Sequence, residues 1–383
     1  MSSVAALRRA LAGVPAYLVG GTVRDLLLGR ERADIDIALE GDVVTAAQRL
    51  GREVKVHERF GTATVRVNGQ TVDLAATRAE SYRSPGALPD VRPAALAEDL
   101  ARRDFTLNAM AVPLAGDLQL IDPHRGAEDL QAARLRVLHP ASFVDDPTRA
   151  LRAGRYAARL GFTLEDETER LLRAAELGTV SEERIEAELR RLAGEGDPLA
   201  PLRLLVEWGL VSADVSLAGV AVGVLEQHGW SELADRGSVL LQAGAVTAGR
   251  FRARSPLAGA RELAAAWPEV PSLLTSDARG RTGVELVLAR ALGAEWLDRY
   301  VDEWRHVRLQ VGGNDLLAAG VPEGPAVGRG LAAALERKLD GEVSGREEEL
   351  AAALEERLAR EDQRLSEGSS SGPDTPLLPP GLH

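Results

Sequence analysis

The stretch AYLVGGTVRDLLLGRERADIDIAL, at residues 16–39, decides how the first part of the chain folds. It begins with a short apolar run that is predicted to be a buried strand, and Gly20 and Gly21 interrupt this strand. Thr22 is expected to cap a helix that carries Arg24. The glycines let the backbone approach an anion closely, and the helix start and the arginine supply donors to it.

The same stretch ends in two aspartates one residue apart, Asp34 and Asp36. Alternate residues of a strand face the same side, so both carboxylates lie together while Ile35 and Ile37 face a core. Two neighbouring carboxylates repel unless a positive charge lies between them, and a divalent metal is the natural candidate. Taken alone, an Asp-x-Asp is typical of surface charge and a Gly-Gly of an ordinary turn. Their combination in one strand–turn–helix–strand unit favours a site for a nucleoside triphosphate and a metal.

Length and composition point to a multidomain globular protein. The chain has 383 residues, of which 45% are hydrophobic, and no apolar run is long enough to span a bilayer. The first fifteen residues are typical of an amphipathic helix and not of a cleaved signal. The sequence has no cysteine, which excludes disulfides and thiolate metal sites and favours a cytoplasmic location.

The formal net charge of −12 is unevenly distributed. Residues 1–192 hold 27 Lys and Arg against 29 Asp and Glu, which leaves 19 against 29 in the remainder. The nearly balanced charge of the first half therefore allows a basic groove for RNA there, whereas the second half is acidic. Arginine greatly outnumbers lysine, which suits phosphate binding but is equally expected from genomic base composition.

The first third of the chain alternates between helical and strand patterns. The segment TATVRVNGQTVDLAAT is predicted to be a hairpin turned at Asn68 and Gly69, with Asp73 on its second strand as a possible third carboxylate. Residues 81–93 are predicted to be a proline-rich loop. Strands are expected at residues 16–19, 34–39, 54–57, 63–67, 70–75 and 118–122.

After about residue 139 strand patterns disappear, and helical patterns rich in Leu, Ala, Arg and Glu continue to residue 362. We therefore predict an α+β protein with a small α/β head and a long helical remainder. The expected divisions are a head at 1–138, a neck at 139–200, a body at 201–300, a tail at 301–362 and a disordered C-terminus at 363–383.

A second polar constellation is RRDFTLNAM, at residues 102–110. Arg103, Asp104 and Asn108 lie unusually close together beside apolar residues. If Arg103 binds phosphate, Asp104 can accept from a ribose hydroxyl. The alternative is a capped helix start, in which Asp104 caps and Asn108 follows one turn later.

A third constellation, VDDPTRALRAGRYAARLGF at residues 144–162, is predicted to be a helix that Asp146 caps and Gly161 ends, with Pro147 at its first position. Taken alone, it is equally typical of a helix with a solvated basic face. Three arginines recur every third residue and are expected to fan over the side where a triphosphate would lie: Arg149, Arg152 and Arg155.

Asp146 and Arg149, one helical turn apart, place an acceptor beside a donor. Cytosine and adenine each present an amine donor beside a ring-nitrogen acceptor, whereas uracil and guanine present a carbonyl beside an N–H. The pair would therefore accept C and A, and would leave buried groups unpaired against U and G.

These segments, in this order, resemble the class II tRNA nucleotidyltransferase and bacterial poly(A) polymerase family. The resemblance covers most of residues 14–192 and again about 309–352. The matching segments are GGTVRDLLLG with DID (20–36), RRDFTLNAMA (102–111), IDPHRGAEDL (121–130), DDPTRALRAGRYAARLGF (145–162), ERIEAEL (183–189), VGGNDLLAAGVPEGPAVGRGL (311–331) and LDGEVSGREEEL (339–350).

The resemblance implies an enzyme that adds nucleotides to the 3′ end of tRNA without a template, with a five-stranded mixed sheet in the head and helical neck, body and tail domains that hold the tRNA. It implies Mg²⁺ as cofactor, CTP and ATP as substrates, and attack of the tRNA 3′-hydroxyl on the α-phosphate by a two-metal route. The resemblance implies that Asp34 and Asp36 bind the metal, with Asp73 as a third carboxylate. It implies that the nucleotide or its triphosphate is contacted by Gly20, Gly21, Arg24, Arg103 and Asn108, and the ribose by Asp104. It implies that Asp146 and Arg149 recognise the base, with support from Arg152 and Arg155.

The sequence departs from the family pattern at two places. Asp145 stands where the first member of the base-reading motif is often glutamate, and the loop between Arg78 and Arg102 is short and contains prolines. In the family such a loop is tied to switching from C to A, so addition of CCA, of CC alone or of A alone all stay open. A poly(A) polymerase, a non-catalytic RNA-binding protein and a nucleotidyltransferase acting on a small molecule also stay open.

Overall fold

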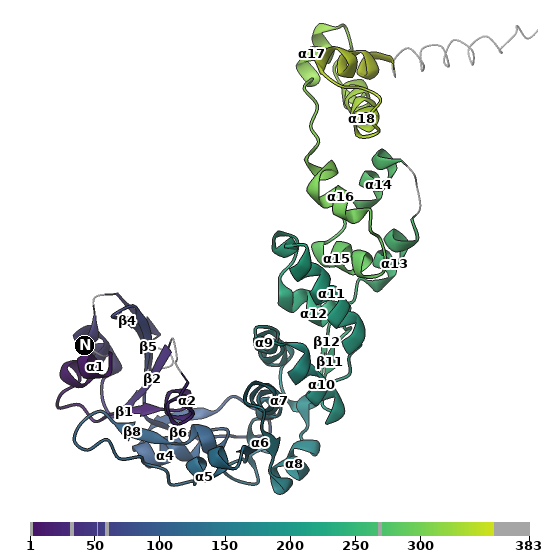
Figure 1. Ribbon diagram of the computed structural model, residues 1–383. Coiled ribbons are helices and arrows are strands. Elements are labelled where there is room, and N and C mark those ends of the chain that lie inside the picture. The colour runs from purple at the N-terminus through teal and green to yellow at the C-terminus, as the bar shows by residue number, and fades with distance from the viewer. Residues whose placement is uncertain (1–2, 31–33, 52, 58–60, 267–269, 356–383) are drawn as a thin grey trace, which may run out of the picture. The chain divides into compact units, whose positions relative to one another are not determined.

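The computed structural model describes residues 3–30, 34–51, 53–57, 61–266 and 270–355. The chain divides into two compact units. The first contains residues 1–222 and 235–255, and the second contains residues 223–234 and 256–383. Figure 1 shows the sheet of the first unit near the N-terminus and helices through most of the rest.

The head is built on a six-stranded mixed sheet with the strand order β3-β4-β5-β2-β1-β8. β2 and β5 are parallel, and the other neighbouring strands are antiparallel. The strands are β1 (Ala16–Val19), β2 (Asp34–Leu39), β3 (Val54–His57), β4 (Thr62–Val67), β5 (Gln70–Ala76) and β8 (Ala111–Pro113).

The predicted hairpin is confirmed as β4 and β5, joined at Asn68 and Gly69. Both turn residues have positive φ, 50° and 82°, which is the twist that a two-residue hairpin requires. On β2, Ile35 and Ile37 are buried as expected, while Asp34 is exposed.

Two expectations about the head were wrong. Residues 118–122 form no strand, and Ile121 makes only an isolated bridge with Ala111. Leu118 and Leu120 are exposed and only Ile121 of this run packs against the core cluster, so β8 forms the sixth strand at the sheet edge in its place. Residues 81–93 are not all loop, because β6 (Arg78–Ser81) pairs with β7 (Asp90–Pro93) and only residues 82–89 connect them.

Short helices surround this sheet, and apolar residues of β1, β2, α4 and the segment before β8 form one core cluster. These helices set the position of the segments that carry the polar constellations. They are α1 (Ser3–Ala10), α2 (Gly21–Leu27), α3 (Val43–Leu50), α4 (Leu96–Ala101), the 3₁₀ turn η2 (Thr106–Asn108) and α5 (Gly126–Gln131).

From residue 139 onward the described chain is mostly helical, as predicted, but three two-residue strands follow that point. β10 (Thr163–Leu164) pairs with β9 (Arg134–Leu135), and β11 (Thr247–Ala248) pairs with β12 (Phe251–Arg252). The helices up to residue 243 are α6 (Ser142–Asp145), α7 (Thr148–Leu160), α8 (Asp166–Arg173), η3 (Leu177–Thr179), α9 (Glu182–Ala193), α10 (Leu199–Glu207), α11 (Val215–Gln227), η4 (Trp230–Glu232) and α12 (Arg236–Ala243).

The second unit continues with α13 (Leu257–Ala265), α14 (Pro271–Ala278), α15 (Gly283–Ala291), α16 (Leu297–Asp302), η5 (Trp304–His306), α17 (Gly313–Ala318) and α18 (Pro325–Leu339). Leu316, Val321 and Ala334 belong to a small core cluster in it. In the described part of the chain no helix is long and apolar enough to cross a membrane. The predicted domain limits stay predictions, and the segment 363–383 lies outside the described residues.

Candidate active site

The carboxylates of the head meet on one face of the sheet. In the parallel pairing of β2 with β5, Asp36 lies opposite Asp73. Asp34 lies opposite Thr71, two residues earlier on both strands. Since side chains alternate along each strand, all three aspartates project from the same face, opposite to Ile35. The parallel pairing of β2 and β5 therefore brings the third carboxylate to the position that the sequence suggested.

Two threonine hydroxyls hold these carboxylates. The Thr22 hydroxyl accepts from the Asp36 backbone N–H at 2.8 Å and donates to Asp36 Oδ2 at 3.3 Å. The Thr64 hydroxyl donates to Asp73 Oδ1 at 2.6 Å. The expectation that Thr22 caps α2 was wrong: Gly20 is the N-cap, with no side-chain cap, because the Thr22 side chain turns to β2.

Gly20 has a backbone conformation that other residues rarely adopt, with φ +61°. A Cβ atom at this position would lie 2.8 Å from Nη1 of Arg103. The glycine therefore allows the Arg103 guanidinium to lie against the turn before α2. Arg103 is fixed there by donating to Asp99 at 2.9 Å and to the backbone carbonyl of Asn108 at 3.2 Å.

Arg24 is buried and held on three sides. Its guanidinium donates to both carboxylate oxygens of Asp25, at 2.8 and 3.0 Å, and to the Asn108 side-chain oxygen at 2.8 Å. It also lies 5.6 Å from the ring centre of Tyr156 on α7. The cation is thus fixed in orientation, in contact with both the RRDFTLNAM segment and α7.

Asp104 is buried and forms an ion pair with the half-buried Arg152, at 2.6 Å. Its other oxygen accepts from the Phe105 backbone N–H and from the Asn108 side chain, both at 2.9 Å. Burial alone would raise the pKa of Asp104, but Arg152 and the Asn108 hydrogen bond outweigh it and hold the pKa below its usual value. Burial works against the charged form of Arg152, yet the facing Asp104 carboxylate raises the pKa of the guanidinium.

Helix α7 brings the third constellation to the same place. The predicted start of this helix was wrong by one residue: α7 begins at Thr148 with Pro147 as its N-cap, because Pro147 already has helical backbone angles. Asp146 precedes the cap, and its Oδ1 atom accepts from the Thr148 backbone N–H. Gly161 ends the helix with φ 73°, as predicted. Arg149 is almost fully buried and donates to the Ser142 hydroxyl at 2.8 Å and to the Arg102 carbonyl at 2.7 Å. Arg149 is therefore hydrogen-bonded directly to the backbone of the RRDFTLNAM segment at residues 102–110.

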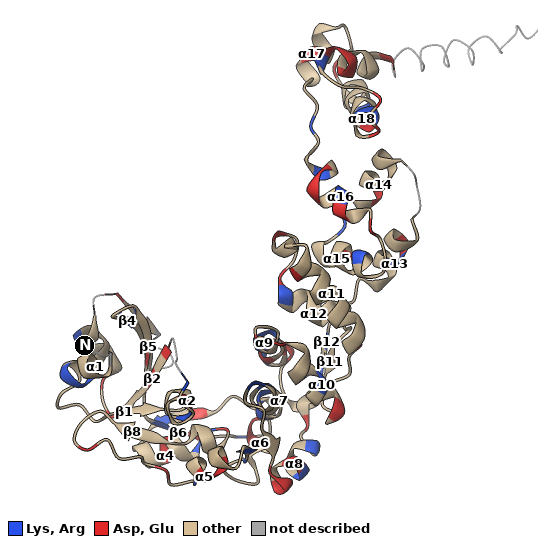
Figure 2. Ribbon diagram, in the orientation of Figure 1, with Lys and Arg blue, Asp and Glu red and all other residues tan. Residues whose placement is uncertain are grey.

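Arg155, about two turns after Arg149 on α7, continues the row of arginines toward α9. Arg155 lies 3.6 Å from Glu188 and 3.9 Å from Glu195, and its guanidinium lies 5.3 Å from the Tyr156 ring centre. Figure 2 shows that basic and acidic residues are interspersed along α8 and α9, so these helices carry no field of one sign. The arginines on α7 are thus partly compensated where they face α9.

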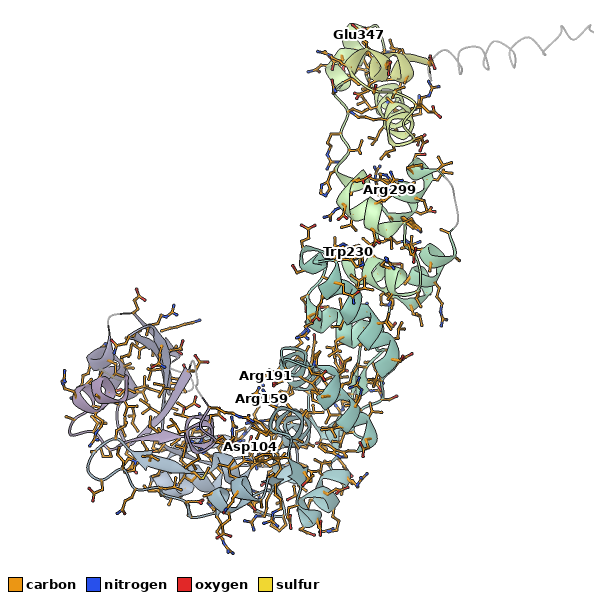
Figure 3. The ribbon with its side chains drawn as sticks, in the orientation of Figure 1. Asp104, Arg159, Arg191, Trp230, Arg299 and Glu347 are labelled. Atoms are coloured by element: carbon orange, nitrogen blue, oxygen red, sulfur yellow. The ribbon has the colours of Figure 1, made fainter. Side chains whose placement is uncertain are left out.

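All predicted site residues except Asp34 line one open cavity of about 740 Å³. Eight arginines and six acidic residues line it, so positive charge exceeds negative charge and suits a polyanion. Figure 3 shows the crowding of side chains around Asp104, between α2 and α7. The charged and aromatic residues that line the cavity but were not predicted from the sequence are Arg78, Glu80, Tyr82, Asp99, Arg102, Tyr156 and Arg159.

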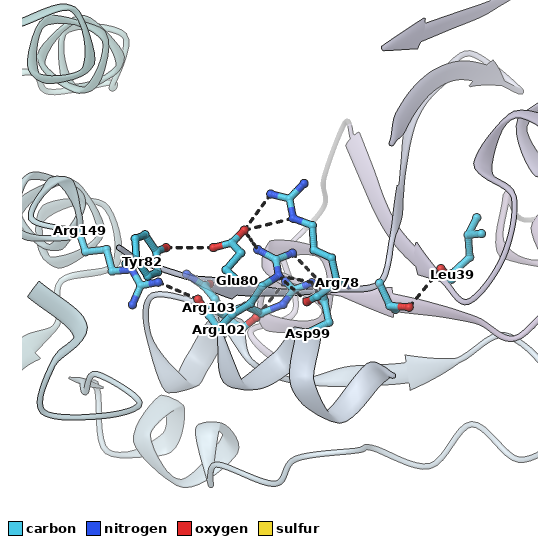
Figure 4. Close-up of polar contacts among 10 residues, drawn as sticks. Leu39, Arg78, Glu80, Tyr82, Asp99, Arg102, Arg103 and Arg149 are labelled. Carbon is cyan, nitrogen blue, oxygen red and sulfur yellow. Dashed lines mark hydrogen bonds and ion pairs between the residues drawn. The ribbon is translucent and has the colours of Figure 1, made fainter. Parts of the chain in front are cut away.

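Several of the missed residues form one network, shown in Figure 4. Glu80 accepts from Arg78 at 3.1 Å, from Arg102 at 2.9 Å and from the Tyr82 hydroxyl at 3.0 Å. Asp99 accepts from Arg102 at 2.7 Å as well as from Arg103. In the sequence, the adjacent Arg102 and Arg103 and the spacing of the arginines on α7 could have indicated a binding site. Glu80 and Tyr82 lie in a segment with no periodic pattern that would indicate one.

Tyr82 lies beside the base-reading residues of α7. Burial, followed by the nearby Glu80 carboxylate, raises the pKa of Tyr82 to about 12, although Arg149 acts in the opposite direction. The phenol therefore stays protonated across the physiological range, and it donates its proton to the Glu80 carboxylate.

The donor set on β2 suits a hard divalent cation. In the described residues no group of three or more His, Asp or Glu side chains is arranged to hold a metal by itself. Asp34 and Asp36 supply carboxylate oxygens from one face, and a Mg²⁺ ion commonly takes only one or two protein carboxylates and completes its shell with phosphate oxygens and water. The residues present therefore fit a metal that arrives with a polyphosphate.

Paired strand carboxylates, a glycine turn and an arginine-rich wall define a head of the nucleotidyltransferase class. Consistent with this, residues 16–136 match the family described as the poly A polymerase head domain. A CC-adding tRNA nucleotidyltransferase of Deinococcus radiodurans is 33% identical over 358 residues, which cover 89% of this chain and 89% of that protein. The chain belongs to the tRNA nucleotidyltransferase family.

Other relatives differ in length. An A-adding tRNA nucleotidyltransferase of Geobacter sulfurreducens is 33% identical over 395 residues, which cover 89% of this chain and 45% of that protein. The chain spans 46%, 45% and 21% of three A-adding relatives, which is less than half the length of each.

Solved structures of the family are similar over most of the chain. A CCA-adding enzyme in complex with ATP has a TM-score of 0.72 and 28% identity, covering 93% of this chain and 94% of that one. A Thermotoga maritima CCA-adding enzyme complexed with tRNA has a TM-score of 0.66 and 27% identity, covering 91% and 94%. The α+β fold predicted from the sequence is thus confirmed, with six strands in the head sheet in place of five.

Proposed function

We propose that this protein adds C, A or both to the 3′ end of tRNA without a template, consuming CTP or ATP and releasing pyrophosphate. One observation carries the proposal. Within one cavity, the carboxylates of Asp36 and Asp73 share space with an acceptor–donor pair on α7, Asp146 and Arg149. Such a site can hold a triphosphate at one end and select a base at the other.

Asp34 and Asp36 are proposed to bind Mg²⁺, with Asp73 as the third carboxylate on the same face. A bound ion there would neutralise the phosphates and lower the pKa of the tRNA 3′-hydroxyl. Thr22 and Thr64 then act as positioning residues, because each hydroxyl fixes the orientation of one aspartate.

The polyphosphate is proposed to lie against Gly20 and Gly21, within reach of Arg103. Arg103 has a buried Nε atom with no hydrogen-bond partner in the described chain, which leaves a donor for an anion. Arg24 contributes mainly its positive charge, because Asp25 and Asn108 already take donors of its guanidinium.

Asp104 is proposed to contact the ribose, and Asn108 holds it in place. Asp146 accepts the exocyclic amine of the base, and Arg149 donates to the neighbouring ring nitrogen. This pattern suits C and A and leaves U and G with unpaired groups. Arg152 and Arg155 support the pair from the following turns of α7.

The partners follow from the same proposal. tRNA is the acceptor, CTP and ATP are the donors, and the reaction belongs in the cytoplasm. We assign residues 1–138 to the head, 139–200 to the neck, 201–300 to the body and 301–362 to the tail, and propose that the helical parts hold the tRNA.

A primer-extension assay tests the proposal. The protein, Mg²⁺ and each nucleoside triphosphate are incubated with tRNA ending before the first C, after one C and after two. We expect incorporation of C on the first two, of A on the third, or of one of these alone. Long runs of A with no C would show a poly(A) polymerase, and no incorporation on any tRNA would refute the proposal.

A further inference from the structure

The segment ERIEAEL forms the first part of α9, and Arg184 within it makes two contacts to other segments. One guanidinium nitrogen donates to the Gly86 carbonyl at 2.7 Å, in the loop between β6 and β7. The second donates to Asp146 Oδ1 at 2.8 Å, at the start of α7. A single planar group therefore bridges the loop and the carboxylate proposed to read the base.

Asp146 is held asymmetrically. Its Oδ1 atom accepts from the Thr148 backbone N–H at 3.1 Å, from the Thr148 hydroxyl at 2.6 Å and from Arg184. In the described part of the chain no hydrogen bond reaches its Oδ2 atom, and the residue lines the cavity. One oxygen is thus saturated, and the other is left for a base amine in a fixed direction.

The loop is fastened at the same point. The Gly86 N–H donates to the Val144 carbonyl at 3.2 Å. Gly86 has φ +71°, and a Cβ atom there would lie 2.6–2.9 Å from Thr179 atoms. The backbone therefore packs directly on the neck, which a side chain would prevent. Tyr82 and Pro89, at the two ends of this loop, both line the cavity.

We propose that Arg184 is a specificity-determining positioning residue, which orients Asp146 and couples its orientation to the loop at residues 82–89. The inference rests on the proposed function. Without the Arg184 donor, the Asp146 carboxylate can rotate about its own Thr148 contacts and can present oxygens in several directions. A base that offers a carbonyl and an N–H is then rejected less strongly, because the fixed acceptor pattern is lost.

The test compares Arg184→Met with Arg190→Met. Arg190 lies on the same helix, pairs with Glu186 at 2.8 Å and is absent from the cavity, so it is a matched control. The measured quantity is the kcat/KM for the preferred nucleotide divided by that for UTP and for GTP. The folded fraction cancels in this ratio, so a loss of stability alone leaves it unchanged.

We expect the ratio to fall about 10-fold or more in Arg184→Met, to recover partly in Arg184→Lys and to stay unchanged in Arg190→Met. Gly86→Ala should lower the ratio in the same way, since it disturbs the contact from the loop side. An unchanged ratio in Arg184→Met, with C or A incorporation otherwise normal, overturns this inference and leaves the proposed function in place.

Hydrogen exchange of the peptide spanning residues 82–89 tests the coupling without any activity measurement. Exchange should be faster in Arg184→Met than in the wild type and in Arg190→Met, because the loop loses its contact to α9. Equal exchange rates overturn the inference. If the wild type incorporates neither C nor A, the proposed function fails, and the exchange result alone then decides the coupling.

Discussion

The ion pair between Asp104 and Arg152 provides the sharpest energetic prediction. Asp104→Asn keeps the size of the side chain, and its oxygen can still accept from the Phe105 N–H and from Asn108. The new amide, however, faces the Arg152 guanidinium where a carboxylate oxygen lay at 2.6 Å. Two donors then oppose each other, and a largely buried cation loses its partner.

Breaking a buried ion pair from one side typically costs 3–5 kcal/mol. The Asp104 side chain is 3% exposed but that of Arg152 is 32% exposed, so solvent screens part of the loss, and we expect about 3 kcal/mol. The pKa of Asp104 is lowered in the folded state, so its contribution is complete above the unfolded pKa of about 3.9 and is lost as the pH falls through the folded value. The difference between wild type and variant should therefore be constant from about pH 5 to 8 and shrink below about pH 4.

Native-state hydrogen exchange of α7 measures this locally, which avoids assuming that the two units unfold together. The control is Asp90→Asn, which removes an exposed pair with Arg83 and should cost no more than about 0.5 kcal/mol. A loss below about 1 kcal/mol for Asp104→Asn, or one that does not change with pH, would refute the buried-pair interpretation.

Three further predictions concern the cavity. Asp36→Ala should lower nucleotide incorporation about 10³-fold or more. Thr22→Val should lower it only about 10- to 100-fold, with the fold retained by circular dichroism, because the hydroxyl only orients the Asp36 carboxylate. Equal activity of Thr22→Val and the wild type would argue against this role. Gly20→Ala should cost about 1–2 kcal/mol in chemical denaturation, since it strains the backbone and displaces Arg103; a neutral effect would contradict the close approach. Tyr82→Phe should remove a phenolate absorbance step near pH 12. In the wild type, the contribution of Tyr82 to stability is present below about pH 10 and is lost as the pH rises toward 12. If the step that the substitution removes lies near pH 10, the burial of Tyr82 is contradicted.

Local patterns predicted much of the head because each rests on a short-range rule. Alternation on β2 placed Asp34 and Asp36 on one face, and Asn68-Gly69 fixed the β4–β5 hairpin and its register. The helical spacing on α7 likewise placed its arginines on one side. These features depend on residues a few positions apart, which a single sequence displays directly.

The contacts between segments were not predictable in the same way. Thr22 was expected to cap a helix, because a hydroxyl after a glycine turn has that local option, yet packing of α2 on β2 gives it the backbone N–H and the carboxylate of Asp36 as partners. Of the apolar run at residues 118–122, Leu118 and Leu120 are exposed and only Ile121 packs against the core. Glu80 and Tyr82 owe their positions to contacts within the head, where Glu80 accepts from Tyr82 and Arg102. Arg184 owes its position to contacts of α9 with Gly86 and Asp146, and no periodic pattern marks any of the three.

The most direct measurement of the central claim is incorporation of labelled CTP and ATP into tRNA that lacks its 3′-terminal CCA, with pyrophosphate release followed in the same reaction. The wild type with Mg²⁺ should add a defined number of C or A residues, release one pyrophosphate for each, and lose both signals with a chelator or with Asp34→Ala and Asp36→Ala together. Undiminished incorporation by the doubly substituted protein, or equal use of UTP and GTP by the wild type, would contradict the account.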